Sequence, residues 1–218
     1  MIDLFTISFT GFHSGERPKL QMDRAFENNS AGCILNPCSI SLPESSLISF
    51  EVAVECANEI IENLLAITEG SERNKLSIVN LLAVSEGCGL IRFLCNTTSK
   101  VKLNAVLVSA CFDRVRTPFG NSFALELKDS GLCHTPPWFD WRQLSVRAGQ
   151  RLLICHGTQD LNPSTPFLDA WSFFLRAVSS GKDISLIQVG GAHHGYACLS
   201  NPDIRERIIN WLYERAEK

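Results

Sequence analysis

A serine lies among small residues in the stretch AVSEGCG, residues 83–89, where one apolar run ends and another begins. Ser85 has Ala83 two positions before it and Gly87 two positions after it. This is the spacing of the G-x-S-x-G nucleophile turn, with alanine for the first glycine. Small neighbours permit a tight turn from strand to helix, and the helix N-terminus favours negative charge that develops nearby. Alone, the pattern fits a turn with a helix-capping serine about as well.

A nucleophilic serine needs a base, and the base needs a group that orients it. Two later loops carry such residues: GTQDLNP places Asp160 after the apolar run RLLICHG, and GGAHHGY places His193 and His194 after DISLIQVG. The order serine, aspartate, histidine is one in which serine triads occur. Two adjacent histidines of one extended loop cannot both face the serine. Agreement in type, order and position favours a catalytic site over a capping serine.

The elements that would position these residues alternate along the chain. Apolar runs rich in β-branched residues predict buried strands, and apolar residues at helical spacing predict helices. The predicted strands are 2–11, 31–40, 75–84, 101–112, 151–157 and 183–190, and the predicted helices are 45–68, 87–96, 164–181 and a last one from residue 201. We therefore expect an α/β protein, a three-layer α/β/α sandwich with a mainly parallel sheet.

Two of the predicted helices have recognisable ends and apolar stripes. Helix 164–181 ends at Gly181, and its stripe consists of Phe167, Trp171, Phe174, Leu175 and Val178. The last helix begins at Asn201-Pro202-Asp203, a good N-cap followed by proline at the first helical position. Its predicted buried stripe consists of Ile204, Ile208, Trp211 and Leu212.

Length and composition narrow the class of protein. The 218 residues fit one domain, 1–218, and the net charge of -3 gives no basic surface for nucleic acid or anionic membranes. No apolar run approaches the roughly 20 residues of a membrane span. The nine cysteines include no CxxC and lie mostly in apolar runs, which indicates reduced core residues of a cytoplasmic protein. We expect neither a metal site nor a cofactor.

The motifs resemble those of the α/β-hydrolase superfamily over nearly the whole chain. The similarity is greatest to its small members: dienelactone hydrolases, carboxylesterases and acyl-protein thioesterases, and the catalytic domains of prolyl-oligopeptidase-like peptidases. HGTQD, residues 156–160, is similar to the family's acid loop, and VGGAHHGY, residues 189–196, to its histidine loop. FTGFHSG, residues 9–15, is similar to its H-G-containing loop, with Thr10 for the histidine. The resemblance implies a fold with a minimal cap, in which the family's two leading antiparallel strands have no counterpart.

The resemblance implies a serine hydrolase that cleaves an ester, thioester or amide of a small or short acyl substrate through an acyl-enzyme. Ser85 would be the nucleophile, His194 the general base and then the acid, and Asp160 the group that orients the imidazole. The oxyanion hole would use the backbone N–H groups of Phe12 and Glu86.

Alternatives stay open at several positions. His13 is an alternative to Phe12, and His193 to His194, although the His-Gly-aromatic match favours His194. Asp113 follows the preceding strand, where some α/β hydrolases carry their acid, although a surface ion pair suits it better. Cys88 lies one turn into the helix after Ser85 and is expected to be structural.

A different class of function also fits the pattern. The chain could be a non-catalytic α/β-hydrolase-fold protein that binds a small ligand or a partner chain. A homodimer could cover the sheet edge that the absent strands would expose.

Overall fold

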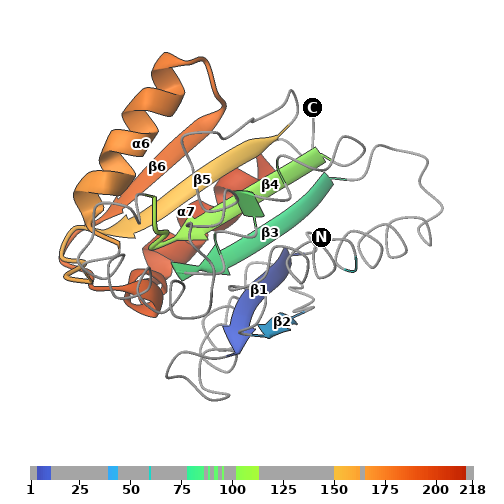
Figure 1. Cartoon of the computed structure of the whole chain (residues 1–218), viewed down its shortest axis with the longest axis horizontal. Coiled ribbons are helices and arrows are strands. Elements are labelled where there is room, and N and C mark those ends of the chain that lie inside the picture. The colour runs from blue at the N-terminus through green and yellow to red at the C-terminus, as the bar shows by residue number, and fades with distance from the viewer. Residues whose placement is uncertain are drawn as a thin grey trace, which may run out of the picture.

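The fold is built on one sheet of parallel strands. The structure, a computed structural model, describes residues 4–10, 39–43, 59, 78–85, 88, 91–92, 95, 102–112, 150–162 and 165–214. In these residues six strands form a sheet in the order β2-β1-β3-β4-β5-β6 (Figure 1). The strands are β1 (Leu4–Thr10), β2 (Ser39–Pro43), β3 (Ile78–Val84), β4 (Lys102–Val108), β5 (Arg151–Gly157) and β6 (Ile184–Val189). Every neighbouring pair among them is parallel, which confirms the predicted sheet.

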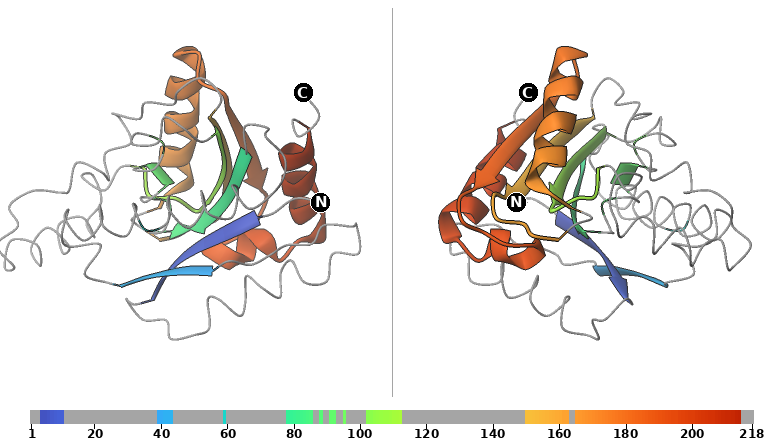
Figure 2. Two further views of the ribbon diagram at one scale, coloured as in Figure 1. Left: turned by 90° about the vertical axis from the view of Figure 1, so that its right-hand side faces the viewer. Right: turned by 60° about the vertical axis from the view of Figure 1, so that its left-hand side comes forward.

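Helices cover both faces of this sheet. The described helices are α6 (Phe167–Ser179), the short 3-10 helix η5 (Gly195–Leu199) and α7 (Pro202–Tyr213). Figure 2 shows α6 and α7 on opposite faces, with the strands between them. The arrangement confirms the predicted three-layer α/β/α sandwich. None of the helices in the described part of the chain combines the length and apolar character needed to cross a membrane.

The α7 face of the sheet carries a continuous apolar core. Alternate residues of strands β3 to β6 point to this face and pack against η5 and α7. The strands contribute Leu82, Val106, Val108, Leu153, Cys155, Ile187 and Val189. The two helices contribute Cys198, Leu199, Ile204, Ile208, Trp211 and Leu212. All four predicted stripe residues of α7 are among them. The helix also begins as predicted, because the Asn201 side chain accepts a hydrogen bond from the Asp203 N–H at 2.9 Å with Pro202 at the first position.

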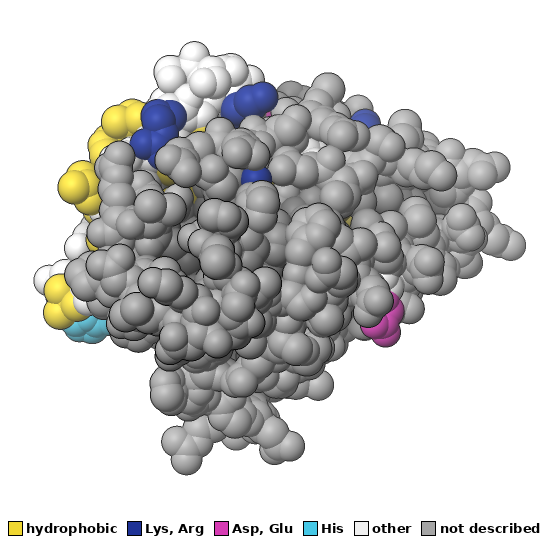
Figure 3. Space-filling model, viewed as in Figure 1, with side chains coloured by type: hydrophobic (Ala, Val, Ile, Leu, Met, Phe, Trp, Pro, Cys, Tyr) yellow, Lys and Arg dark blue, Asp and Glu magenta, His cyan; other side chains and the backbone are white. Residues whose placement is uncertain are grey.

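Helix α6 packs differently from the prediction. Its buried residues are Ala170, Phe173 and Ala177. The residues that face inward are thus two alanines and one phenylalanine. The predicted stripe was therefore wrong: its three aromatic residues are only half-buried, and its last two members, Leu175 and Val178, are exposed. Figure 3 shows hydrophobic side chains exposed along the edge of the molecule where α6 lies in Figure 1.

Strand β2 also differs from its prediction. It runs from Ser39 to Pro43, so it shares only residues 39–40 with the predicted strand 31–40. The remainder of that prediction lies outside the described residues. So does most of the predicted helices 45–68 and 87–96, of which Glu59, Cys88, Ile91, Arg92 and Cys95 are described and helical.

The packing of α6 predicts unequal effects of two truncations. Phe173 is 4% exposed and stacks on Phe112 with ring centroids 4.5 Å apart, so Phe173→Ala should lower the free energy of unfolding by about 3–5 kcal/mol. Leu175 is 50% exposed, so Leu175→Ala should change it by about 0.5 kcal/mol or less. Urea unfolding of both variants measures the difference. Equal losses would show that the flank, and not the alanine-lined face, carries the packing energy.

Candidate active site

Ser85 occupies a constrained position at the carboxyl end of β3. It directly follows Val84, the last residue of the strand, and its φ is 54°. A side chain other than glycine is strained in this left-handed region, and such strain persists only where the surrounding structure imposes it. The serine is half-buried, with its hydroxyl close to the histidine loop. The sequence predicted this tight turn, although Glu86 and Gly87 lie outside the described residues.

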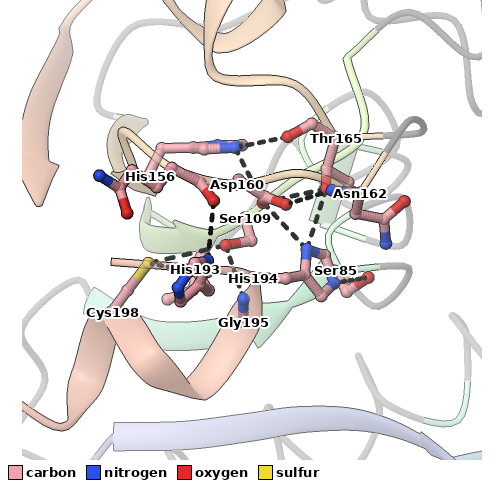
Figure 4. A network of polar contacts seen from close by, with 12 residues as sticks. Ser85, Ser109, His156, Asp160, Asn162, Thr165, His193, His194, Gly195 and Cys198 are labelled. Atoms are coloured by element: carbon pink, nitrogen blue, oxygen red, sulfur yellow. Dashed lines mark hydrogen bonds and ion pairs between the residues drawn. The ribbon is translucent and has the colours of Figure 1, made fainter. Parts of the chain in front are cut away.

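Ser85, His194 and Asp160 form a chain of hydrogen bonds (Figure 4). His194 Nδ1 lies 2.9 Å from Asp160 Oδ2, and His194 Nε2 lies 3.0 Å from Ser85 Oγ. A carboxylate can only accept, so Nδ1 carries the proton that it donates to Asp160. Nε2 is then the acceptor for the Ser85 hydroxyl. A chain of contacts in this order could serve a nucleophile, a base and a group that orients the base.

The carboxylate of Asp160 is buried and surrounded by donors. Asp160 is 7% exposed. Besides His194, the Asn162 N–H donates to Oδ1 at 3.0 Å and the Thr165 hydroxyl donates to Oδ2 at 3.0 Å. His156 Nε2 donates to Oδ2 at 3.2 Å. Burial raises the pKa of the carboxyl, but the hydrogen bonds from His156 and His194, the charge of His194 and the Asn162 N–H outweigh it. The pKa of Asp160 is therefore well below its ordinary value, and the group is ionised at neutral pH.

His156 joins the acid loop to the start of α6. Its ring is completely buried, and Nε2 lies 2.8 Å from the Thr165 carbonyl oxygen as well as 3.2 Å from Asp160 Oδ2. Both partners are acceptors, so Nε2 carries the proton. Nδ1 is buried and has no hydrogen-bond partner among the described residues.

Thr165 is a site residue that sequence reasoning missed. Its hydroxyl lies 2.9 Å from His194 Nδ1 as well as 3.0 Å from Asp160 Oδ2, so it contacts both His194 and Asp160. A threonine five positions after an aspartate is too common to be singled out. The available signal was its place between the acid loop and α6.

The acid loop and the histidine loop are joined by hydrogen bonds. The Gln159 N–H donates to the Ala192 carbonyl at 3.0 Å, and the Thr158 N–H donates to the Val189 carbonyl at 3.0 Å. His193 Nδ1 lies 3.0 Å from the Gln159 carbonyl oxygen, and its side chain is exposed. The structure thus brings His194, and not His193, to Ser85 and Asp160.

Other candidate residues fall into two groups. Phe12, His13, Glu86 and Asp113 lie outside the described residues, so their roles stay predictions. Cys88 is completely buried, which raises the pKa of its thiol, and its sulfur donates to the Ala83 carbonyl at 3.3 Å. It is therefore a poor nucleophile, as expected.

The cysteines that the structure describes are all buried. None of them is part of a disulfide: Cys88, Cys95, Cys111, Cys155 and Cys198. Over the same part of the chain, no group of three histidine, cysteine or acidic residues could hold a metal ion.

Solved structures of similar shape include esterases and a peptidase. No protein-family model and no curated protein matches the sequence. An esterase from Thermogutta terrifontis, Est2, matches with a TM-score of 0.65 and 17% identity over 97% of this chain and 81% of its own. A Staphylococcus aureus protein assigned as an esterase matches with a TM-score of 0.65 and 9% identity over 99% of this chain and 76% of its own. At these identities the likeness shows a shared fold alone.

A peptidase provides the third match. Pyrococcus horikoshii acylaminoacyl peptidase matches with a TM-score of 0.55 and 16% identity over 78% of this chain. The match spans 28% of the peptidase, so this chain corresponds to less than a third of that protein.

The contact between the two loops predicts that a side chain at Gly157 would destabilise the protein. A Cβ atom there would collide with the Ala192 carbonyl oxygen and lie 2.8 Å from the His193 carbonyl oxygen, and both atoms belong to the backbone. Gly157→Ala should therefore force the loops apart and lower the free energy of unfolding by about 1–3 kcal/mol.

Gly190→Ala is the matched control, because a Cβ at Gly190 meets nothing within 4 Å. Chemical denaturation compares the two variants. If both variants were as stable as the wild type, the inference that the loops pack closely at Gly157 would be wrong.

Proposed function

We propose that this chain, which has the α/β-hydrolase fold, is a serine hydrolase with Ser85 as nucleophile, His194 as base and Asp160 as the orienting acid. One observation carries the proposal: the hydrogen-bond chain from Ser85 Oγ through His194 to the buried Asp160 carboxylate. The left-handed Ser85 at the carboxyl edge of a parallel sheet supports it, because ligands of such sheets bind at that edge.

Acylation would begin with attack of Ser85 Oγ on the carbonyl carbon of the substrate. As the C–O bond forms, the serine proton passes to His194 Nε2, and the ionised Asp160 stabilises the resulting imidazolium. His194 then gives this proton to the leaving group when the bond to that group breaks. Water repeats the sequence on the acyl-enzyme: its proton passes to His194, its oxygen attacks the carbonyl, and Ser85 recovers its proton as the acid leaves.

The developing oxyanion requires donors, for which we propose the backbone N–H groups of Glu86 and Phe12. Glu86 directly follows the nucleophile. Strand β1 pairs in parallel with β3, so the chain after Thr10 leaves the sheet at the same edge as the chain after Val84. This topology supports an amide from the loop that contains Phe12.

A short acyl ester is the substrate class that we favour. The Thermogutta terrifontis esterase, which matches most of this chain, has been solved with propionate and with butyrate bound. The free, buried cysteines favour a reducing compartment such as the cytoplasm. The alternative is a non-catalytic binding protein on the same fold, in which Ser85 would be no more reactive than an ordinary serine.

Replacement of the nucleophile separates these functions. The wild-type protein should hydrolyse 4-nitrophenyl acetate and react with a fluorophosphonate, and Ser85→Ala should lower kcat by roughly 10³-fold or more, because a triad without its nucleophile retains little catalysis. The variant should keep the wild-type unfolding midpoint.

Ser200→Ala is the control, since the exposed Ser200 hydroxyl donates to the Ala197 carbonyl and has no contact with Ser85, Asp160 or His194. A wild-type protein that neither hydrolyses the ester nor labels at Ser85 would support the binding protein instead.

The two histidines should behave differently. His194→Ala removes the group that contacts both Ser85 and Asp160 and should lower kcat by about 10²-fold or more. His193→Ala removes, among the described residues, a contact with the Gln159 carbonyl, so we expect kcat within about threefold of the wild type. Steady-state kinetics of both variants tests the assignment, and the reverse ranking would transfer the role of base to His193.

A further inference from the structure

Strand β4 contributes none of the three proposed catalytic residues, yet the residue that follows it is a serine with a left-handed backbone. Ser109 directly follows Val108, is completely buried, and has a φ of 48°. It and Ser85 are the two residues other than glycine with a positive φ in the described part of the chain. Strain of this kind, held in place by a packed surrounding, is concentrated at functional sites.

The contacts of Ser109 lead to the histidine loop. Its N–H donates to the Cys155 carbonyl on β5 at 3.0 Å, and its hydroxyl oxygen accepts from the Gly195 N–H at 2.8 Å. Gly195 directly follows His194 in the chain. Figure 4 shows the Ser109 hydroxyl beside Gly195 and Cys198, whose sulfur lies 3.7 Å from it. Ser109 therefore joins the base's loop to the centre of the sheet.

The strand register fixes where this contact lies relative to Ser85. Val84 of β3 is paired with Val108 of β4, so Ser85 and Ser109 leave the sheet at the same level on neighbouring strands. His194 lies between two fixed points: Nε2 meets Ser85 Oγ at 3.0 Å, and the next peptide N–H is bonded to Ser109. A misplacement of about 1 Å costs an enzyme roughly 10²-fold in rate, so this anchor matters for proton transfer.

The side chain, and not only the backbone, explains a serine at this position. Glycine would adopt a φ of 48° without steric strain. It would, however, leave the buried Gly195 N–H without its acceptor, and a buried donor without an acceptor is destabilising. The hydroxyl is therefore the part of Ser109 that the strained backbone presents to the histidine loop.

We propose that Ser109 is a positioning residue for His194. Its hydroxyl accepts the Gly195 N–H and thereby holds the imidazole at the distance from Ser85 that proton transfer requires. The proposal rests on the proposed function, because it presupposes that His194 acts as the base for Ser85.

Two substitutions test it while separating strain from positioning. Ser109→Ala removes the acceptor and keeps the backbone strain, whereas Ser109→Gly removes both. In each variant we expect kcat for 4-nitrophenyl acetate to fall by about 10- to 100-fold, with KM within about twofold of the wild type. The rate of fluorophosphonate labelling should fall in parallel, since that reaction also needs the base.

Stability measurements complete the test. Ser109→Gly should be at least as stable to urea as Ser109→Ala, because glycine relieves the strain. A purely structural role would predict that the more stable variant recovers its activity, whereas positioning predicts low kcat in both. Activity is expressed per serine that labels at completion, so unfolded molecules do not contribute.

Ser185→Ala is the matched control. The Ser185 hydroxyl also accepts a side-chain N–H from a neighbouring element, Trp211 Nε1 at 3.2 Å, but it makes no contact with the histidine loop. We expect this variant to lose stability and to keep its kcat.

The outcomes distinguish the two proposals. If Ser85→Ala is inactive and either Ser109 variant keeps more than about half of the wild-type kcat, the role of Ser109 is overturned and the proposed function stands. If Ser85→Ala remains active, the proposed function fails, and the role of Ser109 fails with it.

Discussion

Burial of the Asp160 charge is the constraint on which the site depends. An ionised carboxylate removed from water is destabilising by several kcal/mol unless donors replace the lost hydration. The donors come from β5 (His156), from the segment before α6 (Asn162 and Thr165) and from the loop after β6 (His194). No single segment could satisfy the carboxylate, so its burial requires the acid loop and the histidine loop to be in place together. Because its pKa is lower in the folded protein than in the unfolded chain, Asp160 stabilises the fold above the ordinary carboxyl pKa of about 4 and loses this effect as the pH falls.

The sheet provides the second constraint, because it sets the height at which each strand ends. Parallel strands end at a common edge, and their register sets where each chain turns away. Ser85 and Ser109 both turn in the left-handed region immediately after paired valines, and Gly157 ends the next strand in contact with the backbone of the histidine loop. The ends of three neighbouring strands thus surround the histidine loop: Ser85 contacts the His194 ring, Ser109 binds the next peptide N–H, and Gly157 packs against the loop backbone.

The sequence predicted what depends on local pattern and on strand order. Buried parallel strands have continuous apolar runs, so β3 to β6 were recognisable, and their order brought Ser85, Asp160 and His194 to one edge. It could not predict which side of α6 is buried, because the buried Ala170 and Ala177 carry little hydrophobic signal beside Trp171 and Phe174. Nor could it identify Thr165 and Ser109, whose importance comes from contacts with residues 29 and 86 positions away. The His-Gly-aromatic match already favoured His194 over His193, and the structure adds the contact that directs His193 to the Gln159 carbonyl.

The connectivity of the sheet has a consequence for how the protein acquires its chemistry as it folds. Asp160 and His194, the proposed acid and base, belong to one continuous stretch, β5 to η5, and their contact spans 34 residues, whereas the contact between Ser85 and His194 spans 109. Contacts that close long loops form at a greater entropic cost and more slowly than local ones. A chain that has assembled only its C-terminal half would hold Asp160 and His194 paired without Ser85. If Ser85 is the nucleophile that we propose, its reactivity would arise at the end of folding, when β3 docks. The appearance of that reactivity during refolding would then report when the sheet closes rather than when its first strands form.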